Sequence, residues 1–314
     1  MSAFEVLPYD AARRDDYLRL LAQAWGERGL SGEAFDWWFE DNPVGSTRVV
    51  AVRDGSVIGA VGHSRFRARL GGRERVVEFS LHAVTDPIAR GQGVFTALER
   101  ALQERAGAED VACALVVPNR ASRPLYQERL GWTPLAVRRV WARPLRGALA
   151  RLLGRRPRWT AWGAARRVER FGEATDALYE RLAPSLGNHL VRDARHLTWR
   201  YLDAPRDYRV LGSEAGFAVL GRTGRRGASL AVVMDVLAGP GDVPALVRAC
   251  VQEAGSAADA LLALPTPCLP RGTLARLGFA PTPVALRLLG IALGEPLDAR
   301  ADAWTLALGD TDFL

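Results

Sequence analysis

The chain has 314 residues, a length that fits two domains of about 150 residues each. Hydrophobic residues make up 48% and charged residues 25%, which is typical of a globular protein that can bury a core. No apolar run approaches the roughly 18 residues of a membrane span, and residues 1–8 lack the layout of a signal peptide, so we expect a cytoplasmic protein. The net charge of +7 favours anionic small-molecule ligands, whereas nothing in it points to nucleic acid.

Cysteine and histidine are too sparse to form a structural site. The three cysteines, Cys113, Cys250 and Cys268, are widely spaced, and the four histidines are scattered. This spacing predicts neither a disulfide framework nor a bound metal. Cys113 lies inside an apolar run, so we expect it to belong to the core and to be unreactive.

The first half of the chain predicts a mixed α/β domain. Apolar residues recur at helical spacing over 11–25, and Asp54-Gly55 between two alternating runs is typical of a hairpin turn. The remaining predicted elements are a strand at 75–84, a helix at 96–105, a strand at 111–117, a helix at 121–130 and a strand at 132–141. We therefore expect a sheet with helices between its later strands.

An arginine-rich stretch separates this half from the next. Within 138–170 arginine alternates with apolar residues such as Leu145 and Leu152, and Glu169 is its acidic residue. Such a stretch is more often a linker than a basic amphipathic helix that touches a membrane surface or RNA. We predict a first domain at 1–145, a linker at 146–170 and a second domain at 171–314.

The second half repeats the pattern of the first. It predicts helices at 173–182, 194–201 and 243–254, and strands at 208–212, 216–220, 229–237, 260–264 and onward to 308. Two short motifs also recur in the same order: Trp-x-aromatic-x-Asp-x-Pro at 37–43 and 199–205, and Arg-Leu-Gly-aromatic-x-Pro at 129–134 and 276–281. A repeat of this length predicts two similar folds in tandem.

A glycine loop is the most informative segment. Arg90-Gly91-Gln92-Gly93 lies between a predicted strand and a predicted helix. Backbone N–H groups at the start of a helix bind phosphate, and glycines allow the phosphate to approach closely. The loop matches neither the nucleotide-binding P-loop pattern nor the dinucleotide-binding fingerprint.

The order of motifs around this loop resembles the GNAT superfamily of acetyl-CoA-dependent N-acetyltransferases. The residues that carry the resemblance are Arg90 to Gly93, then Asn119, Ser122 and Tyr126, then Gly131-Trp132, and it covers about residues 46–141. The Gly93-Val94-Phe95 version and the motif at 37–43 are similar to a bacterial subgroup whose chains fuse two GNAT-like folds. Phe95 departs from the small residue of many members and is expected to reshape the end of the loop.

The resemblance implies a site with the following residues. Acetyl-CoA would be held by Ala83, Val84, Thr85, Arg90, Gly91, Gln92, Gly93, Val94, Phe95, Asn119 and Ser122. Glu78 would act as general base, with His82 as an alternative on the same strand face at period two. Tyr126 would donate a proton to the departing thiolate. Each has a plainer interpretation: a solvent-facing strand residue for Glu78, a packing aromatic for Tyr126 and a helix cap for Asn119.

The second half is expected to lack this chemistry. Its counterpart of the loop reads Gly239-Pro240-Gly241-Asp242, where proline removes an N–H and aspartate repels phosphate. The position that matches Tyr126 is Thr273. We predict that this half is degenerate, binds no CoA and instead shapes the acceptor site.

The leading hypothesis is an N-acetyltransferase that acts on a primary amine, by direct attack in a ternary complex and without a metal. The acceptor is expected to be a small molecule. Alternatives are an acyltransferase that uses a longer acyl-CoA or an aminoacyl donor, and a catalytically silent acyl-CoA-binding or scaffold protein. A homo-oligomer is compatible with the sequence, which does not specify the oligomeric state.

Overall fold

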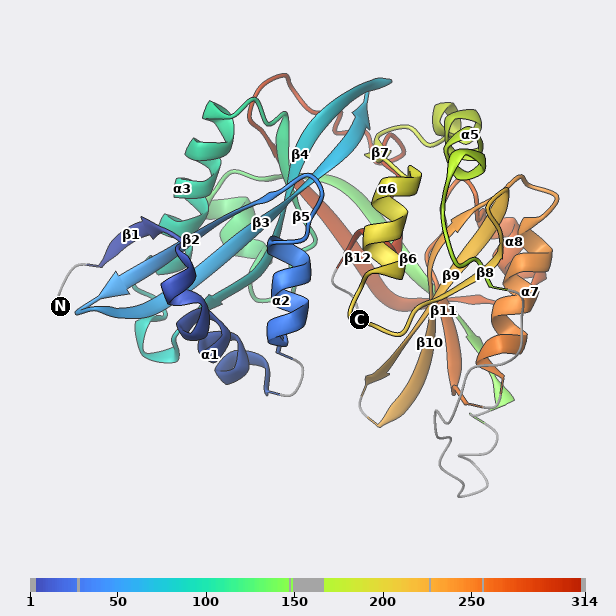
Figure 1. The fold of residues 1–314 in the computed structure, drawn as a ribbon, viewed down its shortest axis with the longest axis horizontal. Coiled ribbons are helices and arrows are strands. Elements are labelled where there is room, and N and C mark those ends of the chain that lie inside the picture. The colour runs from blue at the N-terminus through green and yellow to red at the C-terminus, as the bar shows by residue number, and fades with distance from the viewer. Residues whose placement is uncertain are drawn as a thin grey trace. The chain divides into compact units, whose positions relative to one another are not determined.

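The computed structural model describes residues 4–26, 29–146, 148, 167–225, 227–255 and 257–311. The chain forms two compact units, each a mixed sheet covered by helices (Figure 1). Unit 1 comprises 1–69, 73–135 and 288–300, and unit 2 comprises 70–72, 136–287 and 301–314. The predicted α/β class with a mixed sheet is confirmed.

Unit 1 contains five strands from the first half of the sequence. These are β1 (Glu5–Pro8), β2 (Ser46–Arg53), β3 (Ser56–Leu70), β4 (Arg73–Thr85) and β5 (Cys113–Val116). Its helical elements are η1 (Ala11–Arg13), α1 (Arg14–Trp25), α2 (Gly32–Phe39), η3 (Pro87–Ala89), α3 (Val94–Ala108) and the π-helical η4 (Leu125–Arg129). The hairpin turn is confirmed, because Asp54 and Gly55 both have positive φ, at 49° and 77°. The helix expected over 121–130 is reduced to η4, which begins after Pro124.

The helices of unit 1 cover opposite faces of its sheet. Val94 and Leu98 of α3 pack on Val49 and Val61, whereas Phe39 of α2 lies over Gly62, the next residue of β3. Since neighbouring strand residues point to opposite faces, α3 and α2 cover different sides. A side chain on β2, β3 or β4 can therefore be assigned to the α3 face or to the α2 face.

Strands β4 and β5 pair only briefly before they diverge. Their parallel pairing covers Val77–Phe79 of β4 and Cys113–Leu115 of β5. Further along β4, His82 has a φ of 51°, a left-handed conformation that interrupts regular strand geometry. The end of β4, from Ser80 to Thr85, consequently has a backbone edge that does not pair with β5.

Unit 2 repeats this order of elements. Its strands are β6 (Thr133–Pro144), β7 (His189–Leu190), β8 (Arg209–Ser213), β9 (Gly216–Arg225), β10 (Ala228–Leu237), β11 (Ala260–Ala263) and β12 (Ala280–Ala292). Its helical elements are α5 (Glu173–Leu182), η5 (Ala183–Ser185), α6 (Ala194–Leu197), the π-helical η6 (Thr198–Leu202), α7 (Val243–Ala254), α8 (Arg271–Arg276) and η7 (Leu308–Asp310). The strand prediction that extended to 308 is shortened, because β12 ends at Ala292.

The internal repeat is visible in both units. An antiparallel series of strands leads into α3 and then parallel β5 in unit 1, and into α7 and then parallel β11 in unit 2. Gly131 and Gly278 each end a helical turn before a strand, with φ of 74° and 81°. The order of elements is therefore similar in the two units, which is consistent with the two tandem folds that the sequence predicted.

The two units do not follow the predicted boundary at residue 145. Most of β6 belongs to unit 2, where Trp141–Pro144 pairs with β11. The end of β12 belongs to unit 1, where Leu289–Ala292 pairs with β5. Strand pairing is a contact between distant residues, so a division by chain position could not anticipate it.

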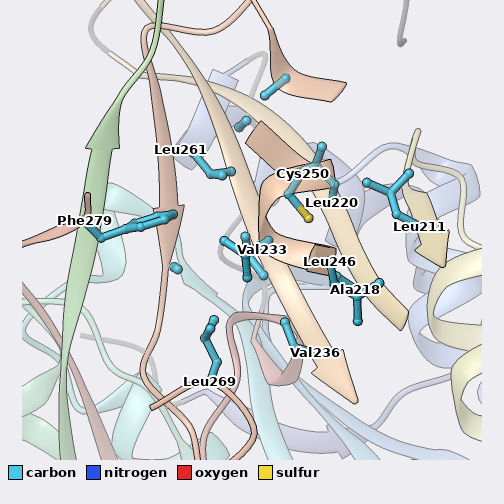
Figure 2. Close-up of a cluster of buried hydrophobic side chains, with 14 of the residues drawn as sticks. Leu211, Ala218, Leu220, Val233, Val236, Leu246, Cys250, Leu261, Leu269 and Phe279 are labelled. Carbon is cyan, nitrogen blue, oxygen red and sulfur yellow. The ribbon is translucent and has the colours of Figure 1, made fainter. Parts of the chain in front are cut away.

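A hydrophobic cluster lies beneath α7 in unit 2 (Figure 2). It packs the helix residues Leu246, Val247 and Cys250 on the strands. The strand residues in contact with them include Leu211, Ala218, Leu220, Val233 and Leu261. The apolar run at 260–263 and the stripe on α7 explain this packing, since both bury hydrophobic surface.

A buried ion cluster lies in the same unit. Arg192 donates from Nε to Asp235 at 2.9 Å and from Nη2 to Asp310 at 2.9 Å, with all three side chains buried. Arg200 holds the backbone of the same C-terminal segment, through the carbonyls of Gly309 and Thr311 at 2.9 and 3.1 Å. Two buried arginines therefore bind residues 309–311 to the rest of unit 2 through hydrogen bonds and an ion pair.

The arginine-rich stretch falls largely on residues 149–166, which lie outside the described residues, so its predicted linker role stays a prediction. In the part of the chain that the structure describes, no helix is both long and apolar enough to cross a bilayer.

Candidate active site

The glycine loop opens at the start of α3. Asp86 accepts a hydrogen bond from the N–H of Ile88 at 3.0 Å and so begins the short turn η3. Gly91 and Gly93 then adopt left-handed conformations, with φ of 76° and 82°, and α3 starts at Val94. Gly93 is the N-cap and has no side chain to satisfy the first N–H groups of the helix. The loop therefore presents unsatisfied donors at the positive end of a helix dipole.

The space over the two glycines is open. A Cβ atom added at Gly91 or at Gly93 would meet no atom within 4 Å. The Gln92 side chain is held by Arg53, which donates to its Oε1 at 2.6 Å, and by the carbonyl of Ile88, which accepts at 2.8 Å. Arg90 is exposed beside the loop. An exposed cradle of N–H groups flanked by an arginine fits an anionic group such as a pyrophosphate.

The predicted thioester-binding residues lie on the free part of β4. Ala83 and Thr85 are half-buried and Val84 is buried. The N–H of Asp86 donates to the carbonyl of Ile58 at 2.9 Å, so this end of β4 still pairs with β3. Its other edge is the one that diverges from β5, which leaves backbone groups available to an extended ligand arm.

Asn119 acts as a cap in this structure. Its Oδ1 accepts from the N–H groups of Ala121 and Ser122, at 2.8 and 3.0 Å. Asn119 is exposed and Ser122 half-buried. The plainer interpretation of Asn119 as a cap is thus observed, and its predicted contact with the pantetheine arm stays a prediction.

Glu78 lies fully buried on the α3 face of the sheet. Its Oε2 contacts His63 Nδ1 at 2.8 Å, and its Oε1 accepts from Arg65 Nε at 3.0 Å and from the Thr47 hydroxyl at 3.2 Å. The plainer interpretation of a solvent-facing residue is wrong. With protein partners on both oxygens and no exposed surface, the carboxylate is not placed to accept a proton directly from a bound amine.

His82 lies on the other face of the sheet. Its ring packs beside Trp38 and Phe39 of α2, with centroid separations of 6.0 Å in both cases, and its carbonyl accepts from Tyr17. The expectation that His82 shares a face with Glu78 is wrong, because the left-handed residue at 82 breaks the alternation of strand side chains.

Tyr126 is buried where β4 leaves β5. Its hydroxyl donates to Glu99 Oε1 at 2.7 Å and contacts Ser80 Oγ at 2.8 Å. Ser80 Oγ also donates to Glu99 Oε1, at 2.7 Å. The ring packs edge-on against Phe95 and Trp132, at centroid distances of 5.3 and 4.9 Å. Phe95 therefore helps to fix the Tyr126 ring.

Histidine 63 joins Glu78 to Glu99. Its Nε2 contacts Glu99 Oε2 at 3.1 Å, while Nδ1 faces Glu78, and all three side chains are fully buried. Burial lowers the pKa of His63, but the carboxylates of Glu99 and Glu78 outweigh it and raise the pKa to about 9. Burial alone would raise the pKa of Glu78, yet the hydrogen bonds and charges of His63 and Arg65 hold it below its usual value. The raised pKa makes the His63 imidazole cationic at neutral pH. The connected side chains Arg65, Glu78, His63 and Glu99 are called the charged string below.

His63, Glu99, Ser80 and Arg65 were missed by the sequence analysis. Glu99 offered the clearest signal, because it sits beside the buried stripe Leu98, Leu102 and Ala106 of α3. A carboxylate among apolar helix positions is rarely buried without a partner. His63 offered only its position in a strand.

The charged string predicts a pH-dependent stability. The pKa of His63 rises from about 6.5 in the unfolded chain to about 9 in the folded one. The contribution of His63 to the free energy of unfolding is therefore fully present below about pH 6.5 and is lost as the pH rises towards 9. We expect the difference in unfolding free energy between wild type and His63→Gln, measured with urea, to shrink over this range. A constant difference would contradict a charged His63.

The other chemical groups of unit 1 do not add a second site. Burial raises the pKa of Cys113 to about 12, as expected of an unreactive core thiol. Within the described ranges, no group of three or more His, Cys, Asp or Glu side chains is arranged to hold a metal ion.

The loop before α7 differs from the glycine loop. Gly239 and Gly241 lack the positive φ of Gly91 and Gly93. The N–H of Asp242 donates to the carbonyl of Gly239 at 3.0 Å, and Asp242 is the N-cap of α7. A carboxylate at the helix start opposes the binding of a phosphate. The predicted lack of CoA binding in this half stays a prediction.

One family model matches the first half of the chain. The acetyltransferase (GNAT) family model matches residues 12–132. A search of curated proteins finds no match.

Solved structures with the same fold include several acyltransferases. A GCN5-related N-acetyltransferase from Anabaena variabilis is 16% identical with a TM-score of 0.66, covering 93% of this chain and 73% of that chain. One from Kribbella flavida is 19% identical with a TM-score of 0.62, covering 92% and 71%. Saccharomyces cerevisiae N-myristoyltransferase with bound myristoyl-CoA is 12% identical with a TM-score of 0.63, covering 93% and 83%. The likeness of fold extends over nearly the whole chain, and the match to the GNAT family model covers residues 12–132.

Proposed function

We propose that this protein is an N-acetyltransferase that transfers the acetyl group of acetyl-CoA to a primary amine of a small molecule. The observation that carries the proposal is the glycine loop, whose left-handed Gly91 and Gly93 expose N–H groups at the start of α3. The divergence of β4 from β5 beside this loop supports an extended thioester ligand. Acetyl-CoA supplies an activated acyl group, which the amine attacks directly in a ternary complex.

Each part of the site has a proposed task. The N–H groups from Gly91 to Phe95 bind the pyrophosphate, with Arg90 adding positive charge. The free edge of β4 at Ala83 to Thr85 binds the arm and the thioester carbonyl. Asn119 and Ser122 bind the arm from the other side, through groups that the cap leaves available.

Proton transfer is assigned to Tyr126. A phenol is a suitable acid for a departing thiolate, because its ordinary pKa is about 10. Glu78 retains a role in proton handling, but we propose that it acts through His63, since its own oxygens are enclosed. The amine is then deprotonated by water or by a group that approaches with the acceptor.

Replacing Tyr126 by Phe is expected to lower kcat by about 10²-fold, because the thiolate loses its proton donor. We expect Glu78→Gln to lower kcat by a smaller factor, because Glu78 reaches Tyr126 only through His63 and Glu99. The measurement is thiol release from acetyl-CoA with a panel of primary amines. The matched control is Tyr9→Phe, since the Tyr9 hydroxyl has no hydrogen-bond partner among the described residues. Full activity in Tyr126→Phe would contradict the assigned acid.

A longer acyl donor is the second candidate. It is favoured by the likeness of fold to an N-myristoyltransferase with bound myristoyl-CoA. Competition for binding between acetyl-CoA, octanoyl-CoA and myristoyl-CoA separates the two. Preference for a long chain would replace acetyl by another acyl group and keep the site. Binding without turnover of any donor would leave a silent acyl-CoA-binding protein, and no binding would favour an aminoacyl donor or a scaffold.

A further inference from the structure

The hydroxyl of Tyr126 lies at the end of a buried string of charged side chains. The string runs from Arg65 to Glu78, His63 and Glu99, and ends at Tyr126. It draws on β3, β4, α3 and η4. Its polar neighbours among the described residues include Thr47 on β2, Ser80 on β4 and the exposed Glu109, which pairs with Arg65.

The fold does not need charged groups at this place. In unit 2 the corresponding helix, α7, packs on its strands through the hydrophobic cluster around Val233, Leu246 and Leu261 (Figure 2). Replacing buried ion pairs by well-packed hydrophobic residues is often neutral or stabilising. A charged string under α3 is therefore costly unless it performs a task, and buried charged clusters of this kind gather at functional sites.

The string fixes the Tyr126 hydroxyl. Glu99 Oε1 faces both hydroxyls, at 2.7 Å from Tyr126 and 2.7 Å from Ser80, while His63 holds Oε2. Because His63 anchors one carboxylate oxygen, the other cannot rotate away. The position of the phenol oxygen is thus set from inside the protein, with Phe95 and Trp132 fixing its ring.

Three oxygens meet at this point: Glu99 Oε1 and the hydroxyl oxygens of Ser80 and Tyr126. They make three contacts with one another but have fewer than three hydrogens to share. With Glu99 ionised, the hydroxyls of Ser80 and Tyr126 supply two protons, one each. Three short contacts connect these oxygens, at 2.7, 2.7 and 2.8 Å. One contact therefore lacks a hydrogen at any moment, and the hydroxyl protons can exchange acceptors without loss of packing. Ser80 can donate to Glu99 while Tyr126 is protonated, and to the phenolate after Tyr126 has given up its proton.

We propose that Glu99, oriented by His63, is a positioning residue that holds the Tyr126 hydroxyl in place, with Ser80 as the donor that stabilises the phenolate. The inference rests on the proposed function of Tyr126 as acid. The step balances as follows: the amine nitrogen bonds to the acyl carbon and gives its extra proton to water, while the C–S bond of the thioester breaks. The Tyr126 hydrogen turns from Glu99 to the departing sulfur, and Ser80 turns its hydrogen to the phenolate oxygen. Solvent protons restore Tyr126 before the next turnover.

A double-mutant cycle tests the inference. We expect Glu99→Gln to lower kcat by about 10-fold or more, and to change kcat much less when Tyr126 is already Phe. The dissociation constant of acetyl-CoA, measured by calorimetry, is expected to stay within about twofold in all variants. Ser80→Ala provides a second cycle with a smaller perturbation, should Glu99→Gln fail to fold.

A readout independent of turnover accompanies the cycle. The ¹³Cζ resonance of Tyr126, assigned by its loss in Tyr126→Phe, is expected to shift at neutral pH in Glu99→Gln. Losses that add independently in the two backgrounds, or an unchanged resonance, would overturn the inference and leave the acetyltransferase proposal intact. Wild-type protein that binds acetyl-CoA without releasing thiol with any amine would overturn both.

Discussion

Gly91→Glu is expected to abolish acetyl-CoA binding, with a loss of affinity of more than about 10³-fold. Two effects act together. Gly91 has a φ of 76°, which a residue with a side chain adopts only with strain. The new side chain would also enter the open space above the loop and place a carboxylate where phosphates are expected to bind. Calorimetric titration of acetyl-CoA into the purified protein measures the result, and wild type is expected to show one site per chain.

Two glycines provide matched controls for this change. Gly107 lies on the same helix, away from its start, and Gly241 lies in the equivalent loop before α7. Both are exposed, and an added Cβ at either would meet no atom within 4 Å. Gly107→Glu and Gly241→Glu should therefore retain wild-type affinity. If Gly241→Glu removed binding instead, the cofactor would belong to the second unit, and our assignment of the degenerate half would be reversed.

Arg192→Ala is expected to reduce the unfolding free energy by about 3–5 kcal/mol, as observed when one partner of a buried ion pair is removed. Arg192 compensates two buried carboxylates, Asp235 and Asp310, at 2.9 Å each. Tyr201 also donates to Asp235, at 3.3 Å, but a neutral hydroxyl cannot replace a cation. Urea denaturation followed by tryptophan fluorescence gives the change. The control is Arg222→Ala in an exposed pair with Asp207, where a loss of at most about 1 kcal/mol is expected.

The loss in Arg192→Ala should depend on pH. Burial already raises the pKa of Asp310, with Arg192 opposing the rise and Asp235 adding to it. Without the arginine the pKa of Asp310 is expected to rise further, because the charge that opposes the rise is gone. A raised folded-state pKa favours the folded state at low pH and loses that effect as the pH rises. The variant should therefore be closer to wild type at pH 5 than at pH 8, and equal losses at both would contradict two ionised carboxylates facing Arg192.

The parts of the site that depend only on residues close together in the sequence could be predicted. The glycine loop needs only a strand, two glycines and a helix in succession, and Gly91 and Gly93 have the left-handed conformations that such a turn requires. The same applies to the turn at Asp54-Gly55 and to the glycines that precede β6 and β12.

The buried string could not be predicted in the same way. His63, Glu78 and Glu99 come from two strands and a helix, and their contacts depend on strand register, in which His63 stands opposite Thr47. The alternation of side chains between the two faces of β4 fails at His82. One residue in the left-handed conformation changes the face to which the side chains point. Strand order fails in a similar way, since no local pattern indicates that β5 pairs with β12.

Strands β6 and β12 each pair with a strand from the other half of the sequence, and this affects folding during synthesis on the ribosome. The first unit takes its last paired strand segment, Leu289–Ala292, from near the end of the chain. Chains emerge from the N-terminus, so one edge of β5 stays without its native neighbour until residue 292 has been synthesised. During that time an open strand edge is available for wrong partners. A fragment that ends at residue 145 would keep this edge permanently, which makes the whole chain, and not its first half, the unit of folding.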